Sequence, residues 1–314
     1  MGGGAVGGRP ARVPARLIRL LAAALDLLAC PHCRGPLDPV APDGRPRLTD
    51  PGVTGPQVTG TVGCWAGHRF DLARQGQLSL LSGRSRTDTG DSAEMVAARV
   101  AFLGAGHYVP IRDAVVGAAM SDGPVLDVGA GPGWYLAGVV DPVPERVGVA
   151  LDSSAFAARR AARVHPRVAA VVADAWSALP VRTASMATVL SIFAPRDLTE
   201  FARVLEPGGR VVAVTPEPEH LAELREPFGL LVVDQGKSDS LVADAAVAGL
   251  TLVADQSVAV RYELTLSSAD AADVVRSGPT ARHRTPAEIA GSAATLPDPL
   301  VVTVSVAVTV LQRD

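Results

Sequence analysis

The sequence predicts an α/β fold with a parallel sheet, preceded by a small domain that holds the cysteines. From about residue 122, short β-branched runs that are apolar throughout alternate with alanine-rich helical stretches. This alternation is typical of a parallel sheet that helices cover on both faces. Ahead of it, residues 25–82 are rich in glycine and proline, carry all three cysteines and show few long periodic runs.

Four regions are expected along the chain: a disordered glycine-rich extension (1–24), the cysteine domain (25–82), a polar linker entering a helix (83–118) and the α/β domain (119–314). Asp91 or Ser92 is the expected N-cap of the linker helix. The strands expected next are 125–128, 147–151, 168–172, 187–192 and 210–215, with helices at 134–140, 154–164 and 196–205. Residues 250–266 and 300–311 are predicted as long strands.

Composition excludes several classes of protein. The chain has 314 residues, is 48% hydrophobic and carries a net charge of −3, which excludes wholesale disorder and a histone-like polycation. Residues 1–114 nevertheless hold 13 arginines against 9 acidic residues. No run reaches the roughly 20 apolar residues that span a bilayer, so no membrane partner is expected.

The three cysteines are too few and too sparse for a disulfide scaffold, and they favour a reducing, cytoplasmic setting. Residues 27–30 superficially resemble a lipoprotein signal, but Asp26 interrupts the apolar run.

Two close pairs of residues predict a metal site. Cys30 and Cys33 enclose a tight turn, and Cys64 lies four residues before His68. Three thiolates and one imidazole complete the tetrahedron that Zn²⁺ prefers, with no open position, so the expected role is structural. The alternative is a set of unliganded thiols beside an unrelated histidine. Trp65, Arg69 and Phe70 flank the second pair and could form either a small core or a nucleic-acid surface. A small core is the use expected of the two aromatic residues.

A glycine-rich turn between the first predicted strand and helix indicates a nucleoside pocket. Gly129, Gly131 and Gly133 let the backbone approach a bound ligand. A dinucleotide fold is the competing explanation, but Asp127 precedes the first glycine and Pro132 lies inside the loop. This order resembles the first motif of class I S-adenosylmethionine-dependent methyltransferases.

Two more carboxylates follow neighbouring predicted strands. Asp152 is placed to bind both ribose hydroxyls, and Asp174 is placed near the adenine. Carboxylates suit these roles because they accept hydrogen bonds from hydroxyl and amino donors. The alternative for each is a helix N-cap.

The wider pattern resembles the bacterial 23S rRNA guanine-N1 methyltransferases of the RlmA/RrmA type, most closely the actinobacterial branch with tylosin resistance. The likeness spans residues 27–314 and rests on segments 30–33, 67–76, 91–99, 106–108, 127–133, 193–196, 215–224 and 278–279. The cysteine pairs and the Phe-Ala-Pro segment on one chain are far more specific than a glycine loop.

The resemblance implies a zinc-bound domain that recognises rRNA, S-adenosylmethionine as cofactor and N1 of a guanine in hairpin 35 of 23S rRNA as acceptor. Nucleotide 748 is favoured over 745, with tylosin-type macrolide resistance as a possible consequence and a homodimer as a possible assembly. Further cofactor contacts are implied at Tyr108, Tyr135, Leu136 and His220.

Phe193, Ala194 and Pro195 follow the fourth predicted strand, where related methyltransferases hold the target base. No side-chain amide is offered here, so backbone carbonyls of 192–194 are expected to bind the base edge. The basic front half suggests a phosphate-contacting surface, with a solvated surface as the alternative, formed by Arg69, Arg74, Arg84, Arg86 and Arg99. Relatives carry aromatic and Met residues around the loop at 278–279, which this chain lacks.

Two other functions stay open. A small-molecule methyltransferase of a natural-product pathway would need no RNA-docking domain. A non-catalytic zinc and RNA-binding module would not need the intact glycine loop and its flanking carboxylates.

Overall fold

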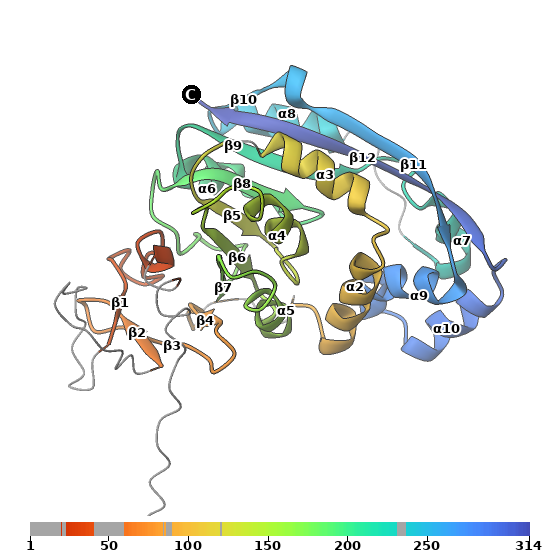
Figure 1. Ribbon diagram of the computed structural model, residues 1–314, viewed down its shortest axis with the longest axis horizontal. Coiled ribbons are helices and arrows are strands. Elements are labelled where there is room, and N and C mark those ends of the chain that lie inside the picture. Colours follow the sequence, from red (N-terminus) through yellow and green to blue (C-terminus); the bar gives the residue numbers. More distant parts are fainter. Residues whose placement is uncertain are drawn as a thin grey trace, which may run out of the picture.

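The computed structural model describes residues 20, 23–40, 60–83, 85, 90–119, 121–230 and 237–314. Most of the expected N-terminal extension, and positions 41–59 between the two cysteine pairs, lie outside these ranges. Figure 1 shows a large twisted sheet with helices on both faces, and a small cysteine-bearing module beside one edge.

The central sheet has the order β10-β12-β9-β8-β5-β6-β7-β4, and β11 also pairs with β12. Its parallel part is formed by β5 (Val125–Val128), β6 (Gly148–Asp152), β7 (Val168–Val172), β8 (Met186–Ile192) and β9 (Leu205–Pro216). Every residue of β5, β7 and β8 is buried, as expected for strands covered on both faces. The chain crosses over next to β5, so ligands are expected at the carboxyl ends of β5 and β8.

Two apolar cores lie on the two faces of this sheet. Val125 of β5 belongs to the core beneath α3 (Val109–Ala118), α4 (Trp134–Val140) and α5 (Ala155–Ala161). Its neighbour Leu126 belongs to the opposite core, beneath α6 (Leu198–Val204) and α8 (Lys237–Val247). Successive strand residues point to opposite faces, so one strand supplies both cores. The cysteine module packs into the second core.

The linker helix α2 (Ala93–Gly104) begins at Ser92, whose side chain accepts a hydrogen bond from the backbone N–H of Met95. The N-cap prediction is therefore confirmed for Ser92. The remaining helices are α7 (Arg225–Phe228), α9 (Ser268–Arg276) and α10 (Pro286–Ala294), with 3₁₀ turns at Ala222–Leu224, Ala254–Gln256 and Pro279–Arg282.

The C-terminal third adds antiparallel strands to the sheet. β12 (Leu300–Arg313) pairs with β9 on one side and with β10 (Leu250–Leu252) and β11 (Val258–Leu266) on the other. A single strand over 250–266 was the wrong prediction, because the 3₁₀ turn at 254–256 divides it. In Figure 1 the paired β11 and β12 form a long arm that reaches α7 and α10.

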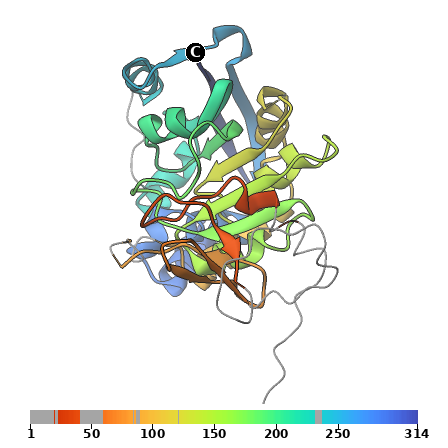
Figure 2. The ribbon, with the colours of Figure 1, turned by 90° about the vertical axis from the view of Figure 1, so that its left-hand side faces the viewer.

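The N-terminal module has a three-stranded sheet of β1 (Asp38–Pro39), β2 (Thr61–Gly63) and β3 (Arg69–Asp71). Strand and bridge pairing joins it to the α/β part at two places. β4 (Leu78–Ser79) pairs in parallel with β7, and Leu28 forms an isolated bridge with Val181. Figure 2 shows the module lying against the main sheet. The proposed domain boundary at residue 82 therefore follows a strand that belongs to the larger sheet.

No helix within the described ranges is long and apolar enough to cross a membrane.

Candidate active site and metal centre

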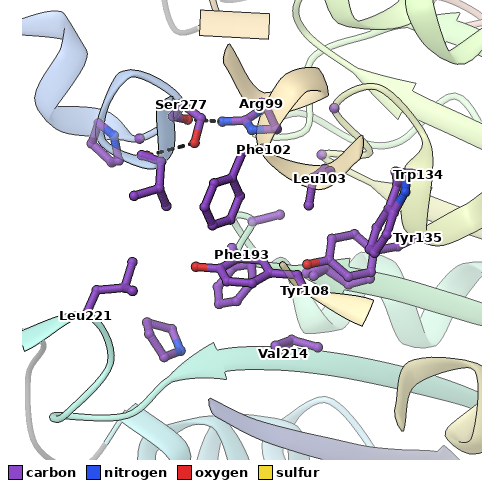
Figure 3. A pocket seen from close by; sticks show the side chains of 18 of the residues that line it. Arg99, Phe102, Leu103, Tyr108, Trp134, Tyr135, Phe193, Val214, Leu221 and Ser277 are labelled. Atoms are coloured by element: carbon purple, nitrogen blue, oxygen red, sulfur yellow. Dashed lines mark hydrogen bonds between the residues drawn. The ribbon is translucent and has the colours of Figure 1, made fainter. Parts of the chain in front are cut away.

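A cavity of about 530 Å³ opens at the carboxyl ends of β5, β8 and β9. One wall is the turn after β5. A second is formed by residues 192–196, from the last residue of β8 onward, and a third by residues 214–225, from the end of β9 onward. Helix α2 and the loop at 277–280 complete the enclosure. Figure 3 shows the rings of Phe102, Tyr108, Tyr135 and Phe193 gathered around this space.

The glycine loop leaves no room for side chains. A Cβ on Gly129 would lie 2.6 Å from the Cβ of Ala194, and its φ of +73° favours glycine. Gly133 also has a positive φ, and a Cβ there would meet Ala161 at 3.2 Å. The first glycine therefore lets the loop after β5 touch the loop after β8, and the third lets α4 pack against α5.

Two buried polar groups at the glycine loop have no partner among the described residues. They are Oδ1 of Asp127 and the hydroxyl of Tyr135. Burial, with a smaller effect from the charge of Asp152, raises the pKa of Asp127 from 3.8 to about 8. A buried acceptor and a buried donor left open beside a glycine-rich turn fit a polar, cationic ligand such as S-adenosylmethionine.

The carboxylates expected at the nucleoside are held by backbone groups. Asp152 accepts from the backbone N–H groups of Gly131 and Ser154, each at 2.8 Å. Asp174 accepts from the N–H of Trp176 at 2.9 Å, in a turn after β7. Neither residue is a helix N-cap, since Ser154 caps α5. The two oxygens of Asp152 each accept one of these hydrogen bonds, so each keeps a second lone pair that a ribose donor can use.

Tyr108 and His220 meet across the cavity. The Tyr108 hydroxyl lies 3.3 Å from Nε2 of His220, and Nδ1 of His220 accepts from the backbone N–H of Ser305 at 3.3 Å. Burial, aided by the charge of Arg225, lowers the pKa of His220 from 6.5 to about 4. The imidazole is therefore neutral and carries its proton on Nε2. It donates a hydrogen bond to the Tyr108 hydroxyl, which can donate its own proton in a hydrogen bond to another acceptor.

Phe193 is the exposed aromatic of this site. Its φ of +53° lies in the left-handed region, which non-glycine residues seldom adopt outside functional sites. The ring stacks on His220 with centroids 5.7 Å apart and 24° between planes, and it lies 6.1 Å from the Tyr108 ring. With 41% of its surface exposed, Phe193 offers a flat apolar face at the cavity.

The five predicted RNA-contacting arginines have different surroundings. Arg69 and Arg74 are exposed on the N-terminal module, and Arg84 and Arg86 lie outside the described residues. Arg99 lines the cavity, where its guanidinium donates to the carboxylate of Asp91 and to the carbonyl of Ser277.

Four side chains of the N-terminal module are positioned to bind one metal ion. The ligand atoms of Cys30, Cys33, Cys64 and His68 all lie within 4.8 Å of one another. Cys64 Sγ is 3.2 Å from Nδ1 of His68, and the sulfurs of Cys33 and Cys64 are 3.6 Å apart. Gly67, with a φ of +89°, closes the second turn. These separations suit a tetrahedral ion with metal–sulfur bonds of about 2.3 Å.

The aromatic residues beside the metal ligands behave differently from one another. Phe70 is buried, as expected, whereas Trp65 is 76% exposed, so the expectation of a small core was wrong for Trp65. His32 is exposed and stacks on the His68 ring at 4.7 Å instead of joining the ligands.

The structure brings six of the ten predicted cofactor residues together around the cavity: Tyr108, Asp127, Gly129, Gly131, Tyr135 and His220. The other four lie outside its lining: Gly133, Leu136, Asp152 and Asp174. The sequence predicts no role in the cavity for four further residues that line it: Phe102, Leu103, Arg196 and Arg225. For Arg196, its position directly after the Phe-Ala-Pro segment could have indicated such a role.

Residues 125–209 match the family model described as a methyltransferase domain. A solved structure of a Bacillus halodurans protein, named as a methyltransferase, is similar with a TM-score of 0.44 and 18% identity. It covers 64% of this chain and 98% of that chain. The fold and its glycine-loop cavity define a Rossmann-like, class I methyltransferase, and its N-terminal module has four side chains positioned to bind a metal.

Two relatives cover nearly the whole chain. The first is a Micromonospora griseorubida protein whose name places it among the 23S rRNA (guanine-N(1)-)-methyltransferases. It is 42% identical over 300 residues, which is 90% of this chain and 96% of that protein. The second is the 23S rRNA (guanine(748)-N(1))-methyltransferase of Streptomyces fradiae, 39% identical over 289 residues, with 90% and 95% covered. The chain belongs to the 23S rRNA (guanine-N1)-methyltransferase family.

Proposed function

We propose that this enzyme transfers a methyl group from S-adenosylmethionine to N1 of a guanine in 23S rRNA. The observation that carries the proposal is the similarity to two relatives named for this reaction, which extends over both the metal-binding module and the α/β part. A methyltransferase that acts on small molecules would not need the metal-binding module.

The donor is proposed to bind at the glycine loop. Gly129, Gly131 and Gly133 shape the turn, Asp127 and Tyr135 offer unpartnered polar atoms, and Leu136 supports them from the core. Asp152 and Asp174 are proposed to bind the ribose and the adenine, with Tyr108 and His220 nearer the methyl group. When bound, S-adenosylmethionine supplies an electrophilic methyl on a sulfonium.

The acceptor base is proposed to enter beside Phe193, Ala194 and Pro195. Guanine N1 lies on the pairing edge, so the base must be unpaired or flipped out of a stack. The exposed face of Phe193 is suited to stacking on such a base, and backbone carbonyls of 192–194 to binding its edge. The enzyme then works mainly by holding the nucleophile and the methyl group in line.

Finer points of the proposal rest on the family. We favour a guanine in hairpin 35, at nucleotide 748 rather than 745, because the Streptomyces fradiae relative is named for guanine 748. Macrolide resistance of the tylosin type would be the biological consequence. The enzyme would act in the cytoplasm, where its substrate lies, and a homodimer stays a prediction.

The metal proposed for the Cys₃His group is Zn²⁺, held for structure because all four positions are filled by protein. The module and the linker after it would dock the RNA, with Arg69, Arg74, Arg84 and Arg86 as candidate phosphate contacts. Arg99 is not kept among them, because its guanidinium donates to Asp91 and to the carbonyl of Ser277. Trp65, exposed beside the ligands, is a further surface on which a base can stack.

Methyl transfer to unmodified 23S rRNA tests the proposal directly. The metal-loaded protein is incubated with labelled S-adenosylmethionine and an unmodified transcript, and primer extension maps the product, since methylation on the pairing edge stops reverse transcriptase. We expect one stop, within hairpin 35. Cofactor binding without transfer to the transcript, or transfer to small molecules only, would contradict the proposal.

A further inference from the structure

Three arginines line the cavity, and two of them are held by other groups of the protein. Arg99 donates to Asp91 and to the carbonyl of Ser277. Arg225 donates to two backbone carbonyls within the segment 218–220. Both guanidinium groups therefore serve to fix the walls of the cavity.

Arg196 differs from these two. Its side chain is half-buried and lines the cavity, yet it forms no hydrogen bond or ion pair with any residue that the structure describes. Burial is the cause that lowers its pKa, and no neighbouring carboxylate offsets it. An arginine does not lose its proton in proteins, so this is an unpaired cation in a partly dry space. A ligand in the cavity can therefore offer its acceptor to this guanidinium without displacing a protein partner.

The position of Arg196 indicates which ligand. It directly follows Pro195, at the end of the segment proposed to hold the target base, and Asp197 after it is the N-cap of α6. The N-cap fixes the backbone on one side, and contact between Ala194 and Gly129 fixes it on the other. Arg196 is thus carried on a fixed turn, three residues after Phe193, and both residues line the cavity.

The described cavity offers no effective base for the proton on guanine N1. Its other titratable side chains are Arg99, Tyr108, Asp127, Tyr135, His220 and Arg225. Burial raises the pKa of Asp127 to about 8, so its carboxyl holds a proton at neutral pH. Burial also lowers the pKa of His220 to about 4, and its one free lone pair already accepts from Ser305. Loss of the N1 proton must be assisted in another way.

We propose that Arg196 donates a hydrogen bond to O6 of the target guanine and stabilises the negative charge that forms there as N1 loses its proton. The proposal rests on the proposed guanine-N1 function. N1 gives its electron pair to the methyl carbon, and the carbon–sulfur bond breaks with its pair kept by sulfur. The N1 proton goes to water, and the products are N1-methylguanine and a neutral thioether.

The same contact would select the base. Guanine presents an acceptor at C6, whereas adenine presents an amino donor there. An unpaired guanidinium accepts no hydrogen bond, so adenine at this position would leave two donors facing each other. A polar pocket whose hydrogen-bonding group is left without its partner rejects the wrong base more strongly than apolar contacts alone do.

The test compares Arg196→Gln and Arg196→Lys with the wild type under saturating cofactor and RNA. Loss of a hydrogen-bond donor that faces developing charge lowers kcat by about 100-fold. We expect that loss for the glutamine variant, a smaller loss for lysine, and a pH–rate curve that levels off at a higher pH. Asp127 titrates in all three proteins and so does not cause the difference. Arg159→Gln, on the exposed side of α5, is the matched control and should keep full kcat.

A synthetic RNA with 6-thioguanosine at the target sharpens the test. Sulfur accepts a weaker hydrogen bond than O6, so the ratio of wild-type to Arg196→Gln rates should shrink on this substrate. An unchanged ratio would show that Arg196 acts elsewhere.

Two further outcomes would overturn the proposal. If Arg196→Gln keeps kcat but weakens binding of S-adenosylhomocysteine, the arginine binds the donor's carboxylate. If it keeps kcat but weakens RNA binding and reduces its salt dependence, the arginine binds a phosphate. A wild-type protein that binds cofactor but methylates no 23S rRNA refutes the proposed function instead, so the two failures are distinguishable.

Discussion

Asp127 is the third residue of β5, and burial of its carboxyl group costs the protein stability. The side chain is 2% exposed, and Oδ1 has no partner among the described residues. Burial makes ionisation unfavourable, and the nearby Asp152 adds to the effect, so the pKa of Asp127 rises to about 8. Such an arrangement is typical of a ligand site, where the ligand supplies the missing partner.

This pKa predicts how stability changes with pH. The carboxyl ionises near 3.8 in the unfolded chain but keeps its proton to about pH 8 in the native protein. Its stabilising contribution is therefore fully present below about pH 4 and is lost progressively as pH rises to about 8. Asp127→Asn removes the effect, so the free energy of unfolding of the variant, relative to wild type, should increase by about 3 kcal/mol between pH 5.5 and pH 8. Urea titrations at both pH values measure it, and a constant difference would contradict the prediction.

Tyr108 and His220 form a pair with a fixed proton arrangement. Because Ser305 donates to Nδ1 of His220, the imidazole donates from Nε2 to the Tyr108 hydroxyl. The neutral ring matters, since the pKa of His220 is lowered to about 4 by burial and by the charge of Arg225. Tyr108 is thereby left as a donor to whatever ligand lies beside it.

His220→Gln is expected to weaken S-adenosylhomocysteine binding by about tenfold, because one oriented hydrogen bond in a buried site contributes roughly 1–1.5 kcal/mol. Calorimetric titration measures the change. Binding by the wild type should not vary between pH 6 and pH 8 on account of this histidine, whose pKa lies below that range. Unchanged affinity in the variant would place the pair outside the cofactor site.

At the scale of elements, the site depends on two loops that touch. The turn after β5 and the segment after β8 approach at Gly129 and Ala194, where a Cβ on the glycine would lie 2.6 Å from the alanine Cβ. Strand pairing between β5 and β8 brings their carboxyl ends together. The sheet thus fixes the position of the glycine loop, where the methyl donor is proposed to bind, relative to the segment after β8, where the target base is proposed to bind.

Gly129→Ala should therefore destabilise the protein by about 2 kcal/mol or more, through a positive φ and an overpacked contact. Cofactor affinity should fall with it. Adding Ala194→Gly removes the clash but not the backbone strain, so it should restore part of the loss. Gly104→Ala is the matched control, because open space surrounds Gly104 at the end of α2. Thermal unfolding and calorimetry read out the series, and equal losses in single and double variants would refute the contact.

The central elements were predictable because their signals are local. The strands at 125–128 and 168–172 and the helix at 134–140 have the predicted bounds, since buried parallel strands and short apolar helices leave clear patterns. The metal ligands were predictable from spacing alone. The pairing of β4 with β7 was not, because two residues carry no periodicity. The lack of a hydrogen-bond partner for Arg196 among the described residues was not predictable either, because it depends on which acceptors the fold brings near the guanidinium.

Considered as a whole, the molecule does not separate cleanly into a binding module and a catalytic part. Cys30 and Cys64 are fully buried, and they share one apolar core with Leu126, Val149 and Leu179 of the α/β part. Arg34 reaches across to the carbonyl of Leu179 at 2.6 Å. The N-terminal module therefore supports the edge of the main sheet.

Metal removal should consequently lower the stability of the whole chain. Without an ion, the side chains of Cys30, Cys33, Cys64 and His68 would lie within 4.8 Å of one another with no shared bond to hold the two turns together. We expect a strong chelator, or Cys64→Ser, to lower the single unfolding midpoint and to increase amide exchange in β7 and β4. Hydrogen exchange and calorimetry measure both effects, with metal re-addition as the control. Two separate transitions, with the α/β part unchanged, would show instead that the metal module is an independent attachment whose only task is to dock the substrate.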